Sequence, residues 1–180
     1  MIVTRLGLAL VKGTRHLDHE ELEFDAQGPI GDRTFCLVDR ACGRVLKTVE
    51  NPRLVGVEVR ATGVGLVATT LVTTGSLARL ARASGDAGRD LDVRFRATMT
   101  LELDSDPAPG ARLSVGALEI EVTRPISRCA VIDLDPATGE RTNTLLLQRI
   151  PAVRGEIPFG MCARVFRPGI VRRGDAVRVL

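Results

Sequence analysis

The chain has 180 residues, of which 44% are hydrophobic and 26% are charged. This composition excludes an intrinsically disordered chain and predicts a buried core. No apolar run approaches the roughly 20 residues that a membrane-spanning helix requires, and the apolar start of the chain contains Arg5 with no cleavage-type site after it. We therefore expect a cytoplasmic protein without a membrane partner.

The charge and the aromatic content argue against a nucleic-acid partner. The net charge is only +3, and the chain has five Phe but no Trp or Tyr, so the aromatic surfaces on which bases stack are largely absent. The basic residues are nearly all arginine, with Lys12 and Lys47 as the only lysines. Because arginine forms paired hydrogen bonds with phosphate and carboxylate groups, an anionic small molecule is a partner to test.

Short β-type runs recur along the whole chain. They alternate apolar and polar residues or are continuously apolar, and turns rich in Gly and Pro separate them. This pattern predicts an all-β fold with a few short helices, closed as a barrel or as two partial barrels because closure removes exposed strand edges. The runs cover residues 1–11, 21–25, 33–39, 53–60, 65–73, 98–104, 111–123, 129–134, 159–166 and 175–180.

Two stretches interrupt the strands as helix candidates. Residues 76–83 form the first, with Ser76 as its N-cap, and a turn-rich stretch at 143–148 forms the second.

Two loops, 39–43 and 135–139, each place Asp first and Gly fifth between β-type runs. Because Asp bonds the backbone ahead of it and Gly supplies a positive φ, both loops are predicted to be hairpin tips.

A small, polar and turn-rich segment at residues 83–91 predicts a boundary between two halves of the chain. Residues 1–82 would form a β-rich N-terminal half, and residues 92–180 would form a β-barrel half. The segment itself would be the linker.

The four cysteines show no C-x-x-C spacing of the kind found in zinc sites, redox dithiols or iron–sulfur clusters. Cys36 and Cys162 lie in strand patterns and are expected in the core, whereas Cys42 lies at a hairpin tip and is expected to be exposed. Cys129 follows a proline-induced bend, where the chain is expected to re-enter a strand. With Arg128 beside it, this thiol can form a thiolate for metal ligation or sulfur transfer, or it can be a small core residue.

His16 and His19 are three residues apart, with Asp18 between them, and could hold a metal if the segment were helical. Only two ligands are evident. The favoured interpretation is therefore a polar loop over residues 15–21.

Several motifs in a fixed order resemble one known family. Four lie in the C-terminal half: Ser-Arg-Cys (127–129), Asp-Pro-Ala-Thr-Gly (135–139), Phe-Gly-Met-Cys-Ala-Arg-Val (159–165) and Gly-Asp-Ala-Val (174–177). Two precede them: Gly-Asp-Arg-Thr-Phe-Cys-Leu-Val-Asp (31–39) and Asn-Pro-Arg-Leu (51–54). Together they resemble the MOSC domain, the C-terminal domain of molybdenum cofactor sulfurases, which is also found in the mitochondrial amidoxime-reducing component and in many small bacterial proteins. The resemblance runs over most of the chain and implies a MOSC-type β-barrel preceded by a β-rich region.

The resemblance also implies roles for individual residues. In that family the cysteine of the Arg-Cys step is the protein ligand to molybdenum, or is proposed as a persulfide carrier, and this role falls on Cys129. Ser127 would lie beside the metal or the pterin as a second catalytic residue. The residues implied to hold a molybdenum–pterin cofactor are Lys12, Gly13, Thr14, Arg33, Arg96, Thr98 and Arg128.

Two positions depart from the family pattern. Reducing members continue the Arg-Phe-Arg segment with Pro-Asn, whereas Arg96 is followed here by Ala97 and Thr98, so a cofactor-binding amide is missing. Relatives often carry an arginine where this chain has Val49. Both changes remove a group from the implied cofactor site.

Three functions are consistent with these residues. The first is binding of a molybdenum–pterin cofactor through Cys129 and two-electron reduction of N-hydroxylated or similar small substrates. Because no flavin or iron–sulfur motif is present, the electrons would come from a separate donor protein. The second is a molybdenum-independent sulfur carrier or sulfurtransferase with a Cys129 persulfide, loaded by a sulfur donor protein. The third is a non-catalytic module that stores or transfers the cofactor.

Overall fold

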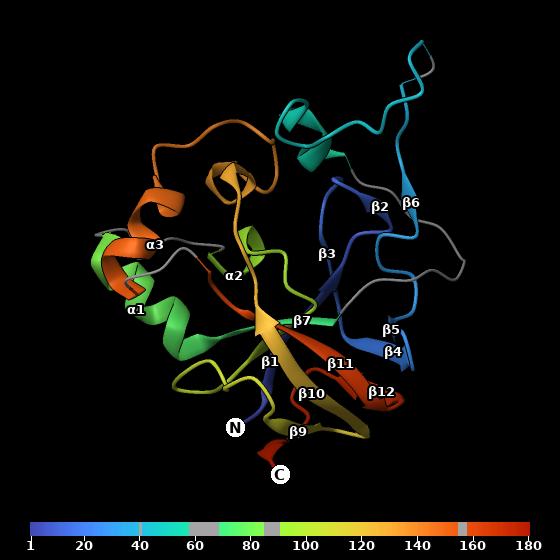
Figure 1. Cartoon of the computed structure of the whole chain (residues 1–180), viewed down its shortest axis with the longest axis vertical. Coiled ribbons are helices and arrows are strands. Elements are labelled where there is room, and N and C mark those ends of the chain that lie inside the picture. The colour runs from blue at the N-terminus through green and yellow to red at the C-terminus, as the bar shows by residue number, and fades with distance from the viewer. Residues whose placement is uncertain (40, 58–68, 85–90, 155–157) are drawn as a thin grey trace.

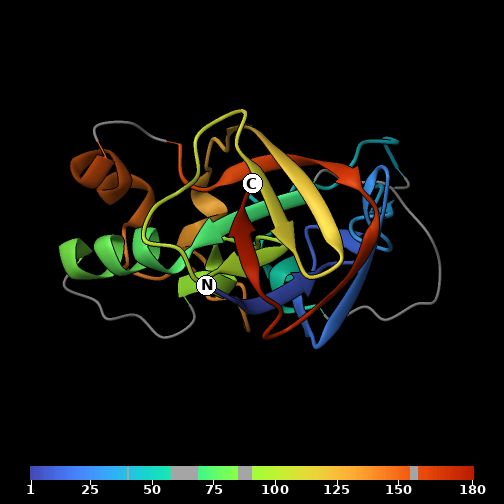
Figure 2. The same cartoon turned by 90° about the horizontal axis from the view of Figure 1, so that it is seen from below.

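Strands from both ends of the chain pair into one barrel (Figures 1 and 2). The computed structural model describes residues 1–39, 41–57, 69–84, 91–154 and 158–180. The barrel closes where the main-chain N–H of Val3 donates to the Asp175 carbonyl at 2.9 Å, next to a bridge between Ile2 and Ala176. In hydrogen-bonded order its strands are β13 (Val177–Val179), β9 (Arg112–Val115), β10 (Leu118–Pro125), β11 (Met161–Arg167), β7 (Thr69–Thr73), β8 (Met99–Leu101) and β1 (Val3–Leu8).

The alternation predicted for the long central strand is confirmed in β10. Leu118, Ile120 and Val122 are fully buried inside the barrel, where they pack with apolar residues of the other strands. Glu119 and Glu121 face outward and form ion pairs with arginines of β11. Period-two side-chain alternation thus separates the core from the surface, as expected for a half-buried strand.

Helices and short turns cover one end and one side of the barrel (Figure 1). They enclose a second apolar cluster, in which the rings of Phe95 and Phe159 stack with centroids 4.3 Å apart. The elements are α1 (Thr74–Ser84), α2 (Leu91–Arg94), α3 (Leu146–Arg154) and the 3-10 helix η2 (Ala130–Asp133). No helix among the described residues is long and apolar enough to cross a membrane.

The N-terminal third adds small sheets beside the barrel. β3 (Leu17–His19) pairs with the second half of β1 and extends the large sheet. The strands of the two smaller sheets are β12 (Gly169–Arg172), β4 (Glu21–Asp25) and β5 (Gly28–Pro29) in one, and the parallel pair β2 (Val11–Lys12) and β6 (Phe35–Cys36) in the other. Together with the barrel they confirm the predicted β-rich fold.

Both helix predictions have wrong boundaries. α1 begins at Thr74, and the Thr73 hydroxyl accepts the main-chain N–H of Ser76 at 3.4 Å, so Thr73 caps the helix in place of Ser76. The second helix, α3, begins only at Leu146, whose N–H donates to the Asp133 carboxylate at 2.6 Å. In each case the side chain that caps the first turn of the helix lies outside the predicted range.

Two predicted strands are wrong. The first run, 53–60, contains the 3-10 helix η1 (Pro52–Gly56), because Pro52 fixes φ at the first helical position and has no N–H to give to a strand. The second run, 129–134, contains the 3-10 helix η2, so the buried Ile132 belongs to a helical turn and not to a strand. Residues 58–60 and 65–68 of the predicted runs lie outside the described residues.

Both predicted hairpin tips are confirmed. The N–H of Gly43 donates to the Asp39 carbonyl, and the N–H of Gly139 donates to the Asp135 carbonyl, each at 2.8 Å. In each loop the Asp carboxylate also accepts the N–H of the residue two positions ahead. The two Asp-first, Gly-fifth loops therefore fold alike for the same local reasons.

The predicted linker at 83–91 falls mostly on residues 85–90, which lie outside the described residues. β7 precedes that segment and β8 follows it, and the two strands pair in parallel within the barrel. The division into residues 1–82 and 92–180 stays a prediction.

The two hairpin glycines offer a matched pair of substitutions. Gly43 and Gly139 have φ values of 67° and 77°, but an added Cβ meets nothing within 4 Å at Gly43, whereas at Gly139 it would lie 2.1 Å from the Pro52 carbonyl oxygen. We expect Gly43→Ala to lower the free energy of unfolding by about 1 kcal/mol, the cost of a left-handed alanine. Gly139→Ala should lower it by roughly 2–4 kcal/mol, because the backbone must also shift. Urea unfolding followed by circular dichroism measures both free energies. Equal losses in the two variants would contradict the close contact between Gly139 and Pro52.

Candidate functional site

A pocket of about 260 Å³ lies where the N-terminal segment, the turn after α2 and the segment after β10 meet. Pairing of β10 with β11 continues past Pro125, since the N–H of Ile126 donates to the Gly160 carbonyl at 3.0 Å, and this carries the next residues to the pocket. Seven of the nine residues predicted from the sequence line it: Lys12, Gly13, Arg33, Arg96, Ser127, Arg128 and Cys129.

Positive charge dominates the pocket. Five cationic side chains line it, and no Asp or Glu is among the described residues that do. A concave site with several cations and no carboxylate favours an anionic ligand. The cations are Lys12, Arg33, Arg94, Arg96 and Arg128.

Arg33 links the N-terminal segment to the turn after α2. Its Nη2 donates to the Arg96 carbonyl at 3.0 Å, and its Nη1 lies 3.1 Å from the Asp32 carboxylate. Asp32 is fully buried and accepts the N–H of Ala9 at 2.9 Å; burial raises the pKa of this carboxyl, while Arg33 acts in the opposite direction. Arg33 and Arg96 both have positive φ, 47° and 52°, a conformation that non-glycine residues rarely adopt and that concentrates at functional sites.

Arg96 is held from the other side by the chain just after β2. Its Nη2 donates to the carbonyl of Thr14. Burial lowers the pKa of Arg96 to about 10, with Arg33 adding to the effect, so the guanidinium still carries its charge at neutral pH. A neutral carbonyl fixes the side chain without cancelling that charge.

Arg128 is fixed by the stacked phenylalanines. Its Nε donates to the Phe159 carbonyl at 2.7 Å, its Nη1 donates to the Phe95 carbonyl at 2.9 Å, and its guanidinium carbon lies 5.0 Å from the Phe95 ring centroid. Burial lowers the pKa of Arg128 to about 10; Arg33 adds to this shift and Asp106 acts in the opposite direction. Nη2 is buried and has no hydrogen-bond partner among the described residues. It is a donor available to a ligand.

Cys129 is exposed and lines the pocket immediately before η2. Its backbone is extended, with φ −126° and ψ 172°, and Ser127 on the same segment is also exposed. The thiol is therefore not a core residue. Of the other cysteines, Cys162 is buried and Cys42 exposed as predicted, but Cys36 is exposed, which corrects its predicted core position.

Thr14 and Thr98 do not line the pocket. Both are buried, and their hydroxyls are used within the protein: that of Thr14 donates to the Val11 carbonyl at 2.8 Å, and that of Thr98 lies 3.3 Å from the Thr70 hydroxyl. They support the walls of the pocket.

Of the two departures from the family pattern, Ala97 is fully buried and Val49 is exposed outside the pocket lining.

Other lining residues were not singled out by the sequence analysis. Thr48, Thr70 and Arg94 belong to the pocket. Arg94 lies in the Arg-Phe-Arg segment that supplied Arg96, so its position in that segment was the available signal. The two threonines carried none.

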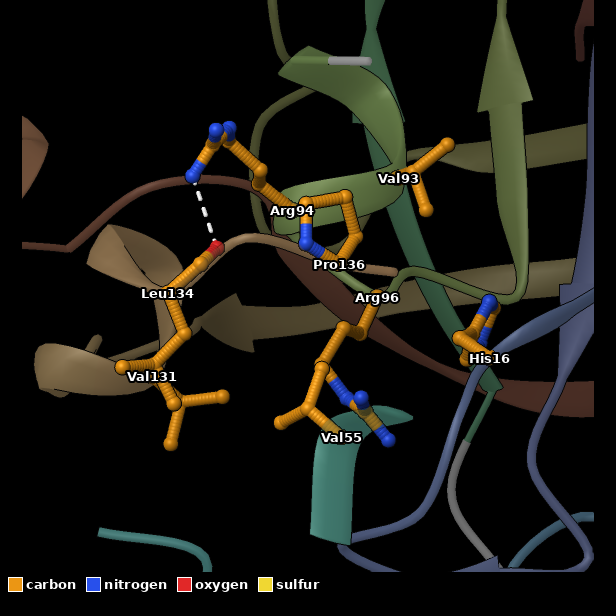
Figure 3. A pocket seen from close by; sticks show the side chains of 8 residues that line it. All are labelled: His16, Val55, Val93, Arg94, Arg96, Val131, Leu134 and Pro136. Atoms are coloured by element: carbon orange, nitrogen blue, oxygen red, sulfur yellow. Dashed lines mark hydrogen bonds between the residues drawn. The ribbon is translucent and has the colours of Figure 1, made fainter. Parts of the chain in front are cut away.

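A second, much smaller cavity lies behind Arg96 (Figure 3). Its volume is about 10 Å³, and it shares Arg94, Arg96 and Val131 with the larger pocket. Arg94 turns its guanidinium toward the Leu134 carbonyl, 2.7 Å away, whereas Arg96 and His16 line the cavity from other segments of the chain. The shared residues show that the cavity adjoins the larger pocket.

The predicted polar loop around His16 is wrong. His16 is 5% exposed, and its Nδ1 lies 3.0 Å from Nη2 of the buried Arg5. The ring packs on Gly7, where an added Cβ would lie 2.6 Å from its Cε1 atom. Burial, followed by the charge of Arg5, lowers the pKa of His16 well below 6.5. No group of three or more potential metal ligands occurs among the described residues, so the metal alternative for His16 and His19 gains no support.

Neutral, buried His16 predicts a pH-dependent stability. Because its pKa is lower in the folded state, its contribution is present above pH 6.5 and is lost as the pH falls below that value, at up to about 1.4 kcal/mol per pH unit. We expect urea unfolding at pH 7.5, 6.5 and 5.5 to show this loss in the unmodified protein and in His19→Gln, and to show less of it in His16→Gln. An identical pH profile for His16→Gln would contradict the assignment.

Comparisons with known proteins agree with this fold. Residues 63–178 match the model of the MOSC domain. Molybdenum cofactor sulfurase from Caenorhabditis briggsae is 35% identical in an alignment 116 residues long that covers 60% of this chain but only 16% of that protein. The chain thus corresponds to a small part of the sulfurase.

Solved structures show the same architecture. The YuaD protein from Bacillus subtilis superimposes with a TM-score of 0.64 at 18% identity, over 98% of this chain and 93% of YuaD. YiiM from Escherichia coli does so with a TM-score of 0.51 at 15% identity, over 100% of this chain and 70% of YiiM. At these identities the likeness shows the fold alone, whereas the family model covers more than half of the chain. The chain belongs to the MOSC domain family and is related to molybdenum cofactor sulfurase.

Proposed function

We propose that the pocket binds a molybdenum–pterin cofactor, with Cys129 as the protein ligand to the metal. One observation carries the proposal: an exposed thiol and five cationic side chains line the same pocket, without a carboxylate among its described lining residues. A thiolate is a soft ligand suited to such a metal, and arginine and lysine suit a phosphate. The donor set of this chain therefore fits both ends of the cofactor.

Three cations would anchor the phosphate. Arg33 and Arg96 are held in position by carbonyl groups and by Asp32, and Lys12 approaches from β2. Arg128 would add the unused Nη2 donor beside Cys129. Because hydrogen bonds within the protein fix the arginines in advance, little side-chain freedom is lost when an anion binds.

For the reaction we propose two-electron reduction of N-hydroxylated or similar small substrates. The bound cofactor supplies the two-electron chemistry at molybdenum. Cys129 would hold the metal, and Ser127, exposed on the same segment, would orient the substrate or the cofactor. A separate electron donor protein would deliver the electrons, because the sequence has no flavin motif and no iron–sulfur spacing.

Metal content tests the role of Cys129. The unmodified protein, purified from cells that make the cofactor, should contain near-stoichiometric molybdenum and pterin, and Cys129→Ser should lose most of both. Cys36→Ser is the matched control, because Cys36 is exposed but lies outside the described pocket lining. Elemental analysis and the near-ultraviolet spectrum measure the two components, and the absence of Trp and Tyr keeps the protein background low. Molybdenum retained in Cys129→Ser, or absent from all three proteins, would refute the proposal.

The exposure of Cys129 favours a second candidate function, that of a sulfur carrier. An exposed thiol can meet a donor protein directly. The Cys129 thiolate would attack the outer sulfur of a persulfide on the donor, so that Cys129 becomes the persulfide and the donor leaves as a thiolate. This transfer requires no molybdenum.

Mass spectrometry separates the two functions. A molybdenum-free protein that carries a sulfur on Cys129, seen as a mass increase that a reductant removes, would support the carrier function. We expect Cys129→Ser to lack the added mass and Cys36→Ser to retain it. A persulfide on Cys36 or Cys42 but not on Cys129 would contradict the assignment, because those exposed thiols are not among the described residues that line the pocket.

A further inference from the structure

The tautomer of His16 follows from its partner. Nδ1 of the ring lies 3.0 Å from Nη2 of Arg5, and an arginine can only donate, so Nδ1 is the acceptor. A neutral ring with an accepting Nδ1 carries its proton on Nε2. The assignment rests on this hydrogen bond, and it makes Nε2–H a donor.

The described part of the chain offers that donor no acceptor. His16 is more than nine-tenths buried, and Nε2 has no hydrogen-bond partner among the described residues. The ring lines the small cavity behind Arg96, whose only other polar lining side chains, among those described, are Arg94 and Arg96, both donors (Figure 3). About 10 Å³ is room for one water-sized atom. The Leu134 carbonyl at the cavity already accepts from Arg94, so a bound oxygen would supply the acceptor that His16 Nε2–H lacks among the described residues.

We infer that this cavity binds one oxygen of an oxyanion, held jointly by His16 Nε2–H and the Arg96 guanidinium. Arg96 lines both the cavity and the larger pocket, so an anion bound at Arg96 can direct one of its oxygens into the cavity. His16 is then a specificity residue for tetrahedral oxyanions. The inference rests on the anion-binding part of the proposed function and does not require molybdenum or pterin.

The surroundings of His16 keep it a neutral donor. Arg5 holds Nδ1 and is itself fixed by Asp18 at 2.6 Å and by Asp92 at 3.9 Å. Arg96, Arg33 and His19 add further positive charge near the ring, and the two carboxylates bind Arg5 and not the imidazole. Anion binding through His16 should therefore not strengthen as the pH falls through the normal range of histidine titration.

Sulfate is a suitable probe, because it stays a dianion throughout the pH range tested. Calorimetric titration of the full chain, purified from cells that cannot make the pterin cofactor, should give a sulfate affinity that changes less than about twofold between pH 5.5 and 8. We expect His16→Leu to weaken binding about tenfold. His16→Gln, whose amide can donate from a similar position, should recover most of the affinity, and His19→Gln should bind like the unmodified protein. Equal affinity in all four proteins would overturn the inference.

A second measurement needs no substitution and so does not depend on how the variants fold. The chain has only two histidines, so nitrogen-15 spectra of the imidazole rings are simple to assign. His16 should be protonated at Nε2, and its Nε2 signal should shift with the calorimetric dissociation constant as sulfate is added. Protonation at Nδ1, or an Nε2 signal that sulfate leaves unchanged, would overturn the inference. Because no cofactor is present, failure here is distinct from failure of the molybdenum proposal.

Discussion

The charge of the candidate site depends on how its arginines are held. Four partly buried hydrogen bonds hold Arg33, Arg96 and Arg128, and the acceptor in each is a main-chain carbonyl: Arg96 for Arg33, Thr14 for Arg96, and Phe95 and Phe159 for Arg128. A carboxylate in those positions would neutralise each guanidinium, whereas a carbonyl orients it and leaves its charge. Asp32 pairs with Arg33, but among the described residues neither it nor any other carboxylate lines the pocket. The wall is therefore rigid and cationic, which is what a preorganised anion site requires.

The same hydrogen bonds explain why the site lies at this end of the barrel. Arg33 and Thr14 belong to the N-terminal third, Arg96 follows α2, and Arg128 follows the end of β10. The barrel brings these segments together because β7, β8 and β1 are neighbours on one side, and β10 and β11 continue the sheet on the other. The positive φ of Arg33 and Arg96 is strain that the surrounding contacts sustain. The fold thus supports two unfavourable backbone positions and several close positive charges at one place.

Sequence patterns predicted correctly those features that depend on residues close together in the chain. The alternation in β10 and the two Asp-first, Gly-fifth hairpins follow from short-range rules. Predictions were wrong where a partner distant in the chain decides. Asp133 sets the start of α3, and Arg5 together with Gly7 draws His16 into the interior, although its polar sequence neighbours favour a loop. Cys36 lies in an apolar run but in a two-residue strand with one partner strand, which leaves it exposed.

Arg96 connects the two cavities, and its chemistry sets what each can hold. In the larger pocket it acts with Lys12, Arg33 and Arg128, where several charges can share a bulky anion. In the smaller cavity its partner is a neutral imidazole, and space for one atom limits the guest to a single oxygen. A cationic His16 there would add charge but would break the bond from Arg5, whose guanidinium has only donors to offer. The buried Arg5–His16 pair is therefore stable only with a neutral ring, and a neutral N–H selects an acceptor by its position and not by its charge.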